Sequence, residues 1–264
     1  MFVPLHDGVP LRFMRAPYVT YGLVSTCIGL FLLMWLRESE STQIAVAAGF
    51  GLIPSVLFGT AQLPTDLLQA PVWLTLFSNI LLHASFAHLG GNMLFLWVFG
   101  DNVEDALGHI KFLIFYLLCA AAGAFLHGVI LPDSEAPLIG ASGAIAGIVS
   151  AYLLLHPHVR VWVLAFGRIP LRIPAIYPLV LWVVTQFAML LWGGQEQVSW
   201  PAHVGGIIAG AVLIVIMKRR SVPLFDRAIV SPRAVVVEKE PEPVTREAEP
   251  VSYTHLTLPT NREV

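Results

Sequence analysis

Long apolar runs separated by short polar segments recur along most of the chain. A helix that crosses the hydrocarbon core of a bilayer needs about 20 mostly apolar residues, and charge-poor windows of roughly this kind occur six times. The helices that they predict cover residues 18–36, 87–105, 109–130, 142–155, 175–192 and 201–217. The fourth is the shortest, because about 14 residues at 1.5 Å each span about 21 Å, whereas the hydrocarbon core is about 30 Å thick. The pattern predicts an all-α, polytopic six-helix membrane bundle whose fourth helix begins below the membrane surface.

The segment between the first two apolar runs, residues 37–86, is long and rich in apolar residues and proline. It is too apolar for a flexible linker, and such segments can lie in the membrane interface as short amphipathic helices. We therefore predict a long interfacial first loop on the outer face, with Trp73 near the lipid headgroups.

The remaining segments of the chain differ from this membrane domain in composition. Residues 1–17 are predicted to form a cytoplasmic N-terminal segment, and residues 18–217 the membrane domain. Glutamate and proline dominate much of residues 218–250, which is typical of a disordered cytoplasmic tail. The stretch VSYTHL at 251–256 is similar to the translated end of a sequencing adapter, so residues 251–264 are expected to be non-native.

Composition and charge placement agree with a membrane protein. Hydrophobic residues make up 56% of the chain and charged residues only 12%, which excludes an ordinary soluble domain. Lysine and arginine gather on the loops that six crossings would place on one side, whereas only Arg37 falls on the other. The residues on the first side are Arg12, Arg15, Lys111, Arg160, Arg168, Arg172, Lys218, Arg219 and Arg220. The positive-inside rule then predicts that both termini lie in the cytoplasm.

A single serine stands where the fourth apolar run begins, in PLIGASGAIAG at 137–147. Ser142 is a candidate nucleophile, since the free N–H groups of a helix N-terminus can stabilise a developing oxyanion. The alternative is that Ser142 is only an N-cap residue, a common role for serine. The soluble motif G-x-S-x-G does not decide between these roles, because its fifth position is Ala144.

A histidine, His203, lies near the start of the sixth run in WPAHVGGIIAG. A histidine inside a membrane span suggests a functional site, although a hydrogen-bonded core histidine remains an alternative. Small residues four positions apart let two helices approach closely, which would bring His203 within reach of Ser142. They are Gly143 and Gly147 on the fourth helix and Gly206 and Gly210 on the sixth.

A third group of polar residues occurs in HASFAHLGGN, where His88 and Asn92 share one helix face and His83 precedes them. Both side chains can donate hydrogen bonds to an oxyanion. The spacing is poor for a metal, since no H-E-x-x-H is present and no carboxylate accompanies these groups. Cys27 and Cys119 fall within apolar runs, so neither a disulfide nor a thiolate site is suggested, and we expect no metal and no cofactor.

With these groups in order along one chain, the sequence resembles the rhomboid family of intramembrane serine proteases over about residues 2–218. The similarity lies in PLHD, GLIP, HASFAHLGGNMLFLWVFGDNVEDALG, GASGAIAG and AHVGGIIAG. The resemblance implies that Ser142 is the nucleophile and His203 its general base. It further implies an oxyanion hole formed by the backbone N–H of Ser142 and the side chains of His88 and Asn92.

The resemblance also implies supporting residues. His83 and Glu104 match positions with a structural role, and Gly140 permits the turn into Ser142, while Gly143, Gly206 and Gly210 allow close helix packing. One departure concerns Ala146, which stands where some members carry an aromatic residue that stacks on the catalytic histidine. What holds His203 in this chain is left open by the sequence.

The implied reaction is hydrolysis of a peptide bond in or next to a transmembrane helix of a substrate, without metal. The expected surroundings are the lipid bilayer of a bacterial cytoplasmic membrane, with a site open to the outer face and no nucleic-acid partner. Substrate access would involve motion of the fifth helix and of the loop 192–200, which contains the pair Gly193-Gly194.

The alternative function is a catalytically silent rhomboid-like protein that binds transmembrane helices. A channel or transporter is disfavoured because the intramembrane polar groups cluster near one face. The sequence identifies neither a substrate nor an oligomeric state.

Overall fold

The protein is a mostly helical membrane protein. A computed structural model describes residues 2–37, 39–193 and 198–226, which all belong to one compact unit. Its long helices are α1 (Tyr18–Arg37), α5 (Phe86–Leu107), α6 (His109–Ile130), α7 (Ser142–Leu155), α8 (Ile176–Trp192) and α9 (Trp200–Met217). They coincide with the predicted apolar helices to within two residues at each end.

The described helices differ in whether they could cross a bilayer alone. By length and composition, α1, α6 and α9 each suffice, and the bent pair of segments Val72–Leu81 and Phe86–Leu107 would make a fourth crossing if it counts as one span. Helices α7 and α8 are apolar but shorter. The count of three to four such helices does not establish the predicted six crossings.

The chain between α1 and α5 forms short helices, and their predicted position in the membrane interface stays a prediction. These are α2 (Glu40–Phe50), α3 (Pro54–Leu57), η1 (Val72–Leu74), α4 (Thr75–Ser78) and η2 (Asn79–Leu81), of which η1 and η2 are 3₁₀ helices. A short antiparallel bridge ties this loop to the segment before α7, since Leu52 and Leu138 donate backbone hydrogen bonds to each other at 3.0 and 2.7 Å. The first loop therefore holds the segment that leads into α7.

A three-stranded antiparallel sheet corrects the all-α prediction. Strands β1 (Phe2–His6), β2 (Arg160–Ala165) and β3 (Ile169–Pro174) pair in the order β1-β2-β3. The turn between β2 and β3 contains Phe166 and Gly167, both with positive φ (51° and 68°). Positive φ at both central residues matches the type I′ turn, whose twist suits a tight hairpin.

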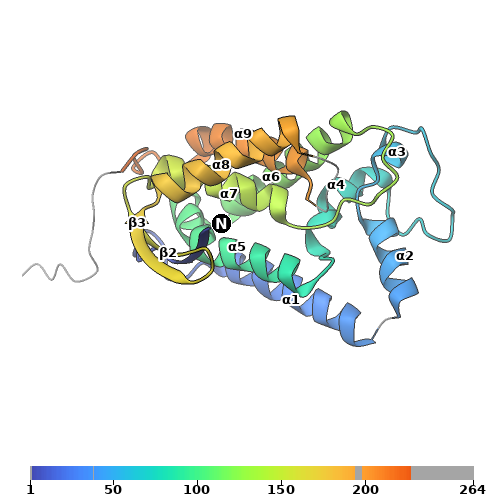
Figure 1. Cartoon of the computed structure of the whole chain (residues 1–264), viewed down its shortest axis with the longest axis horizontal. Helices are drawn as coiled ribbons and strands as arrows, with labels where there is room; N and C mark the ends of the chain where they lie inside the picture. The colour runs from blue at the N-terminus through green and yellow to red at the C-terminus, as the bar shows by residue number, and fades with distance from the viewer. Residues whose placement is uncertain (1, 38, 194–197, 227–264) are drawn as a thin grey trace, which may run out of the picture. The chain divides into compact units, whose positions relative to one another are not determined.

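The sheet and the first loop lie at opposite ends of α5 and α7 (Figure 1). Helix α7 is central, because it packs against α5, α6, α8 and α9 and nearly all of its residues are buried. A helix surrounded by protein can be shorter than the bilayer core, since its ends need not meet lipid.

Glu104, close to the C-terminal end of α5, holds the N-terminus of α1. Its carboxylate is fully buried and accepts hydrogen bonds from Val19 N (3.0 Å), Thr20 N (2.8 Å) and Thr20 Oγ1 (2.6 Å). His109 Nδ1 lies 2.5 Å from the same carboxylate. A negative charge at a helix N-terminus satisfies free N–H groups and interacts favourably with the helix dipole, so the structural role expected for Glu104 has a concrete geometry.

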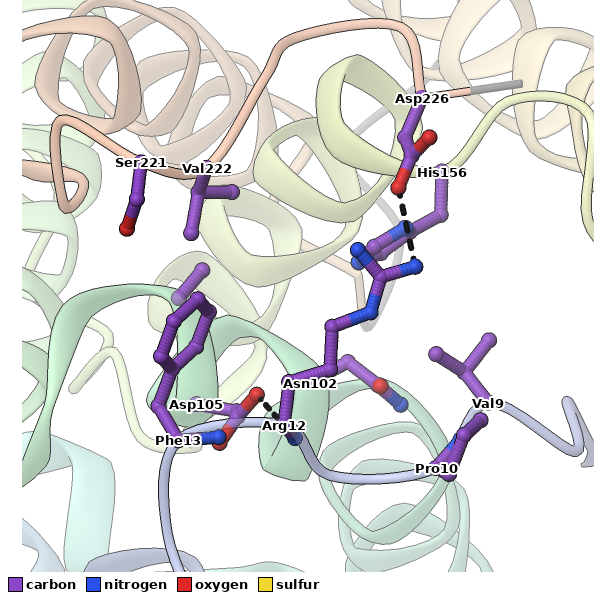
Figure 2. Close-up of a pocket in the computed structure, with 11 residues that line it drawn as sticks. Val9, Pro10, Arg12, Phe13, Asn102, Asp105, His156, Ser221, Val222 and Asp226 are labelled. Atoms are coloured by element: carbon purple, nitrogen blue, oxygen red, sulfur yellow. Dashed lines mark hydrogen bonds and ion pairs between the residues drawn. The ribbon is translucent and has the colours of Figure 1, made fainter. Parts of the chain in front are cut away.

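The segments that precede α1 and follow α9 meet at this same end of the bundle. Asp105 accepts backbone hydrogen bonds from Arg12, Phe13 and Met14 at 2.8 to 3.0 Å. The Arg12 side chain and Asp226 form an ion pair of 3.1 Å, and both residues line a small pocket together with His156 (Figure 2). Residues 218–226 are thus placed against the helix ends, whereas the rest of the predicted tail, including 251–264, lies outside the described residues.

Substitution of Glu104 by alanine is expected to destabilise the fold strongly. The change leaves the first-turn N–H groups of α1 and the Thr20 hydroxyl without an acceptor, and each such buried unsatisfied donor costs about 1–3 kcal/mol. Reversible unfolding in mixed micelles measures the loss. The exposed Glu135→Ala is the control, and equal stability of the two variants would contradict the role given to Glu104.

His156, which directly follows α7, is expected to make the fold sensitive to acid. Burial lowers its pKa from 6.5 to about 4, and the nearby Arg12 acts in the same direction, while Asp226 and Asp105 oppose it. As the pH falls from 6.5 to 4, the unfolded chain binds a proton that the folded state does not. Stability therefore falls across this window, by up to about 3 kcal/mol from this residue.

The measurement is the free energy of unfolding at several pH values between 7 and 4. Because carboxylates also titrate at low pH, the readout is the difference in slope between the parent and His156→Gln. The exposed His158→Gln serves as the matched control. An identical pH dependence of the parent and His156→Gln would refute the assignment.

Candidate active site

The chain enters α7 through a glycine that no other residue could easily replace. Gly140 has φ +119°, a region that side chains disfavour, and its N–H donates to Asn79 O at 2.9 Å. Ala141 is the N-cap residue and Ser142 the first residue of the helix. Among the described residues no side chain caps α7, so the hydroxyl of partly exposed Ser142 is not used as an N-cap.

His88 and Asn92 lie beside this turn. A Cβ atom built on Gly140 would lie 2.5 Å from His88 Nε2 and 3.8 Å from Asn92 Nδ2. The backbone N–H of Ala84 donates to His88 Nδ1 at 3.4 Å, which assigns the proton of the neutral ring to Nε2. Asn92 Nδ2 is buried and has no hydrogen-bond partner among the described residues. Two side-chain donors therefore converge next to the N-terminus of α7.

Glycines bring α7 and α9 into backbone contact. A Cβ on Gly206 would collide with the Gly143 carbonyl oxygen, and one on Gly210 with that of Gly147. Both contacts join residues 63 positions apart, so the helices run parallel and in register. The same offset places His203 level with Gly140, about 3 Å along the axis from Ser142 at 1.5 Å per residue. The close contact that the glycine spacing predicted is confirmed.

His203 is buried on this interface, and its hydrogen bond runs to α8. Its Nδ1 lies 2.8 Å from Gln186 Oε1, and the rings of Trp182 and Trp200 are 6.0 and 6.1 Å away between centroids. Among the described residues no hydrogen bond joins Ser142 Oγ to His203. The two residues are neighbours across the α7–α9 contact, but the dyad hydrogen bond is not formed in this structure.

A second serine–histidine pair is hydrogen-bonded nearby. Ser199 Oγ lies 2.7 Å from His127 Nδ1 and also accepts the backbone N–H of Ala202 at 3.2 Å, so it caps α9 and joins this helix to α6. The pair has the geometry of a structural link. It provides an internal comparison for the Ser142–His203 assignment.

His83 packs its ring against that of His88, with centroids 5.2 Å apart at 63°. Both of its ring nitrogens are buried without a partner among the described residues. This placement suits a supporting position beside the two donors.

Sequence reasoning missed Gln186 and the Ser199–His127 pair. A signal for Gln186 was available, because it is a polar amide within the apolar run 175–192, and polar groups within membrane helices usually have a partner. The predicted mobile loop 192–200 cannot be compared, since its residues 194–197 lie outside the described residues.

Comparisons with known proteins agree with the resemblance noted above. A family model described as a rhomboid domain matches residues 70–220, which is more than half of the chain. The chain is 33% identical over 135 residues to Rhomboid protein 1, mitochondrial, of Saccharomyces cerevisiae, covering 49% of this chain and 38% of the yeast protein.

Two bacterial relatives are similar over a longer stretch. Rhomboid protease GluP of Bacillus subtilis is 29% identical over 196 residues, 74% of this chain and 34% of GluP. Rhomboid protease GlpG of Salmonella paratyphi A is 23% identical over 199 residues, 75% of this chain and 63% of GlpG. The matched region therefore spans less than two thirds of each of these relatives.

The backbone contact between α7 and α9 is expected to tolerate no side chain at Gly206. In Gly206→Ala, the added methyl group must push the helices apart, and such overpacking costs about 1–3 kcal/mol. Thermal unfolding in detergent measures the loss. Gly22→Ala on α1, where a Cβ meets nothing within 4 Å, is the control and should be neutral or stabilising; an equally stable Gly206→Ala would contradict the contact.

Proposed function

The chain belongs to the rhomboid family, and from this premise we propose that it is an intramembrane serine protease. It hydrolyses peptide bonds in or next to transmembrane helices of membrane-protein substrates. The observation that carries the proposal is the convergence of Ser142, His203, His88 and Asn92 at one end of α5, α7 and α9, within an apolar helical bundle. The names of GluP and GlpG as rhomboid proteases add support.

In the proposed mechanism, Ser142 Oγ attacks the carbonyl carbon of the scissile bond while His203 Nε2 takes its proton. The negative charge that develops on the carbonyl oxygen accepts hydrogen bonds from Ser142 N–H, His88 Nε2–H and Asn92 Nδ2. Collapse of this intermediate expels the amine, which receives the proton from His203, and leaves an acyl-enzyme on Ser142. Water then hydrolyses the ester with His203 again as the base.

The unpaired state of Asn92 Nδ2 is chemically suited to this role. A buried amide donor without a partner costs about 1–3 kcal/mol, and such groups in native proteins often serve a function. An oxyanion would satisfy it only during the reaction. The unpaired amide of Asn92 therefore supports a site that stabilises an oxyanion over a site that only binds a helix.

We further propose six membrane crossings with both termini in the cytoplasm of a bacterial cell. The contact between Arg12 and Asp226 supports an even number of crossings, because these residues precede the first long helix and follow the last. The site lies at the opposite end of α7, which the distribution of arginine and lysine assigns to the outer face. Exposed Trp73 on the first loop would then lie at the outer interface.

A second candidate function is a catalytically silent protein that binds transmembrane helices. The missing hydrogen bond between Ser142 and His203 is the observation that favours it. In enzymes, however, catalytic hydrogen bonds are often long or poorly aligned in the free state and tighten only when substrate is bound. A fluorophosphonate probe separates the two, since only an activated serine reacts.

Replacement of either member of the proposed dyad is expected to abolish cleavage. Ser142→Ala removes the nucleophile and His203→Ala the base, and a positioned base alone contributes about 10²- to 10⁴-fold. The assay is cleavage of a transmembrane reporter by the purified protein in liposomes, with fluorophosphonate labelling at Ser142. Ser199→Ala, in the second serine–histidine pair, is the matched control and should still cleave and label; cleavage by both dyad variants at the parental rate would refute the proposal.

A further inference from the structure

The environment of His203 differs from the support that an aromatic residue on α7 would provide. Ala146 occupies that position and is too small to reach the ring, and its Cβ instead contributes to the close contact with Gly206. The side chains around the ring come largely from α8, which supplies Gln186 and Trp182. The group that fixes the histidine must therefore be sought on α8.

The hydrogen bonds of Gln186 determine which nitrogen of His203 carries the proton. Gln186 Nε2 donates to Trp182 O at 2.9 Å, and a carbonyl oxygen can only accept. The amide oxygen Oε1 is thereby turned toward His203, at 2.8 Å from Nδ1. Because Oε1 is an acceptor, Nδ1 must be the protonated nitrogen, and Nε2 keeps the lone pair that a general base needs.

Because both residues are buried, this hydrogen bond favours one tautomer of His203. Gln186 is only 3% exposed and His203 9% exposed, so water competes little with their contact. In the other tautomer of His203, the Nδ1 lone pair would face the lone pairs of Oε1, and both polar groups would be left buried without a partner. Such unpaired groups cost about 1–3 kcal/mol each, which favours one tautomer by a factor of ten or more.

We propose that Gln186 is a positioning residue that holds His203 in the tautomer and orientation of a general base toward Ser142. The proposal deepens the proposed function and rests on it. Gln186 lies on α8, whereas Ser142 and His203 lie on α7 and α9. A movement of α8 would therefore change the support of His203. Helix α8 borders an apolar cavity of about 360 Å³ toward α5, lined among others by Phe95, Phe99 and Trp182, so α8 has space on that side.

The test compares substitutions at Gln186 in the full-length protein in liposomes, with a transmembrane reporter as substrate. Gln186→Leu removes the acceptor and is expected to lower kcat by about 10- to 100-fold with little change in KM. Gln186→Glu keeps an acceptor, so it should recover much of kcat relative to leucine. Its negative charge favours the protonated imidazole, so the acidic limb of the pH–rate profile should move to higher pH.

Thr185→Val is the control on the same helix. Thr185 is exposed, and its hydroxyl donates only to Leu181 O within α8, so this variant should keep the parental kcat and pH profile. Parental kcat and pH profile in Gln186→Leu would overturn the proposal. So would a loss that Thr185→Val shares, or one that glutamate does not rescue and that leaves the pH profile unmoved.

A spectroscopic readout separates this proposal from the proposed function. The ¹⁵N spectrum of histidine distinguishes the two tautomers, and His203→Gln identifies the signals of His203. The parent should show His203 protonated on Nδ1 alone, and Gln186→Leu a mixture of both tautomers. If the parent neither cleaves nor reacts with fluorophosphonate, the proposed function fails, but these spectra still decide the role of Gln186: an unchanged tautomer in the leucine variant would refute it.

Discussion

The backbone contact between α7 and α9 is the constraint on which the rest of the site depends. The helices touch at the glycine pairs Gly143–Gly206 and Gly147–Gly210, with no side chain between them. Ser142 and His203 lie at the end of this contact, so the fixed register of the two backbones sets their separation. Close approach through small residues also lets dispersion and weak contacts hold helices together where the surrounding lipid gives no hydrophobic driving force. The stability of the bundle and the proposed chemistry thus both require small residues at these positions.

At the opposite end of the bundle, two carboxylates accept hydrogen bonds from free backbone N–H groups at the start of α1 and in the segment that precedes it. Glu104 and Asp105 stand side by side at the end of α5 and accept bonds from the α1 first turn and from residues 12–14 respectively. These carboxylates fix α1 against α5 at the sheet end, while His88 and Asn92 project from the opposite end of α5. Helix α5 therefore carries the two carboxylates at one end and His88 and Asn92 at the other. A displacement of α5 at the carboxylate end would also move His88 and Asn92 relative to Ser142.

The sequence predicted the helices well because long apolar runs leave little choice of conformation, and α7 begins at Ser142 and ends at Leu155 as the pattern indicated. The β2–β3 hairpin was not predicted because its turn uses Phe166-Gly167 rather than a strong turn pair such as Asn-Gly. The strand β1 depends on pairing with a segment more than 150 residues away, which no local pattern reveals. The contact of Gln186 with His203 could not be predicted either, because a polar residue in a span indicates that it has a partner but not which residue that partner is.

The position of Gln186 shows how His203 is held although Ala146 replaces the aromatic residue that some family members carry on α7. An aromatic residue on α7 would hold the histidine from the same helix as the proposed nucleophile Ser142, so the orientation of the proposed base would not depend on α8. Here a small residue at 146 lets α9 approach α7 closely, and the support for the ring moves to Gln186 and Trp182 on α8. A helix that borders an apolar cavity can shift at low cost in packing, because the atoms on that side have few contacts to lose. A displacement of α8 into this cavity would move Gln186 Oε1 relative to His203 Nδ1, so the orientation of the proposed base and the position of this helix are linked through one hydrogen bond.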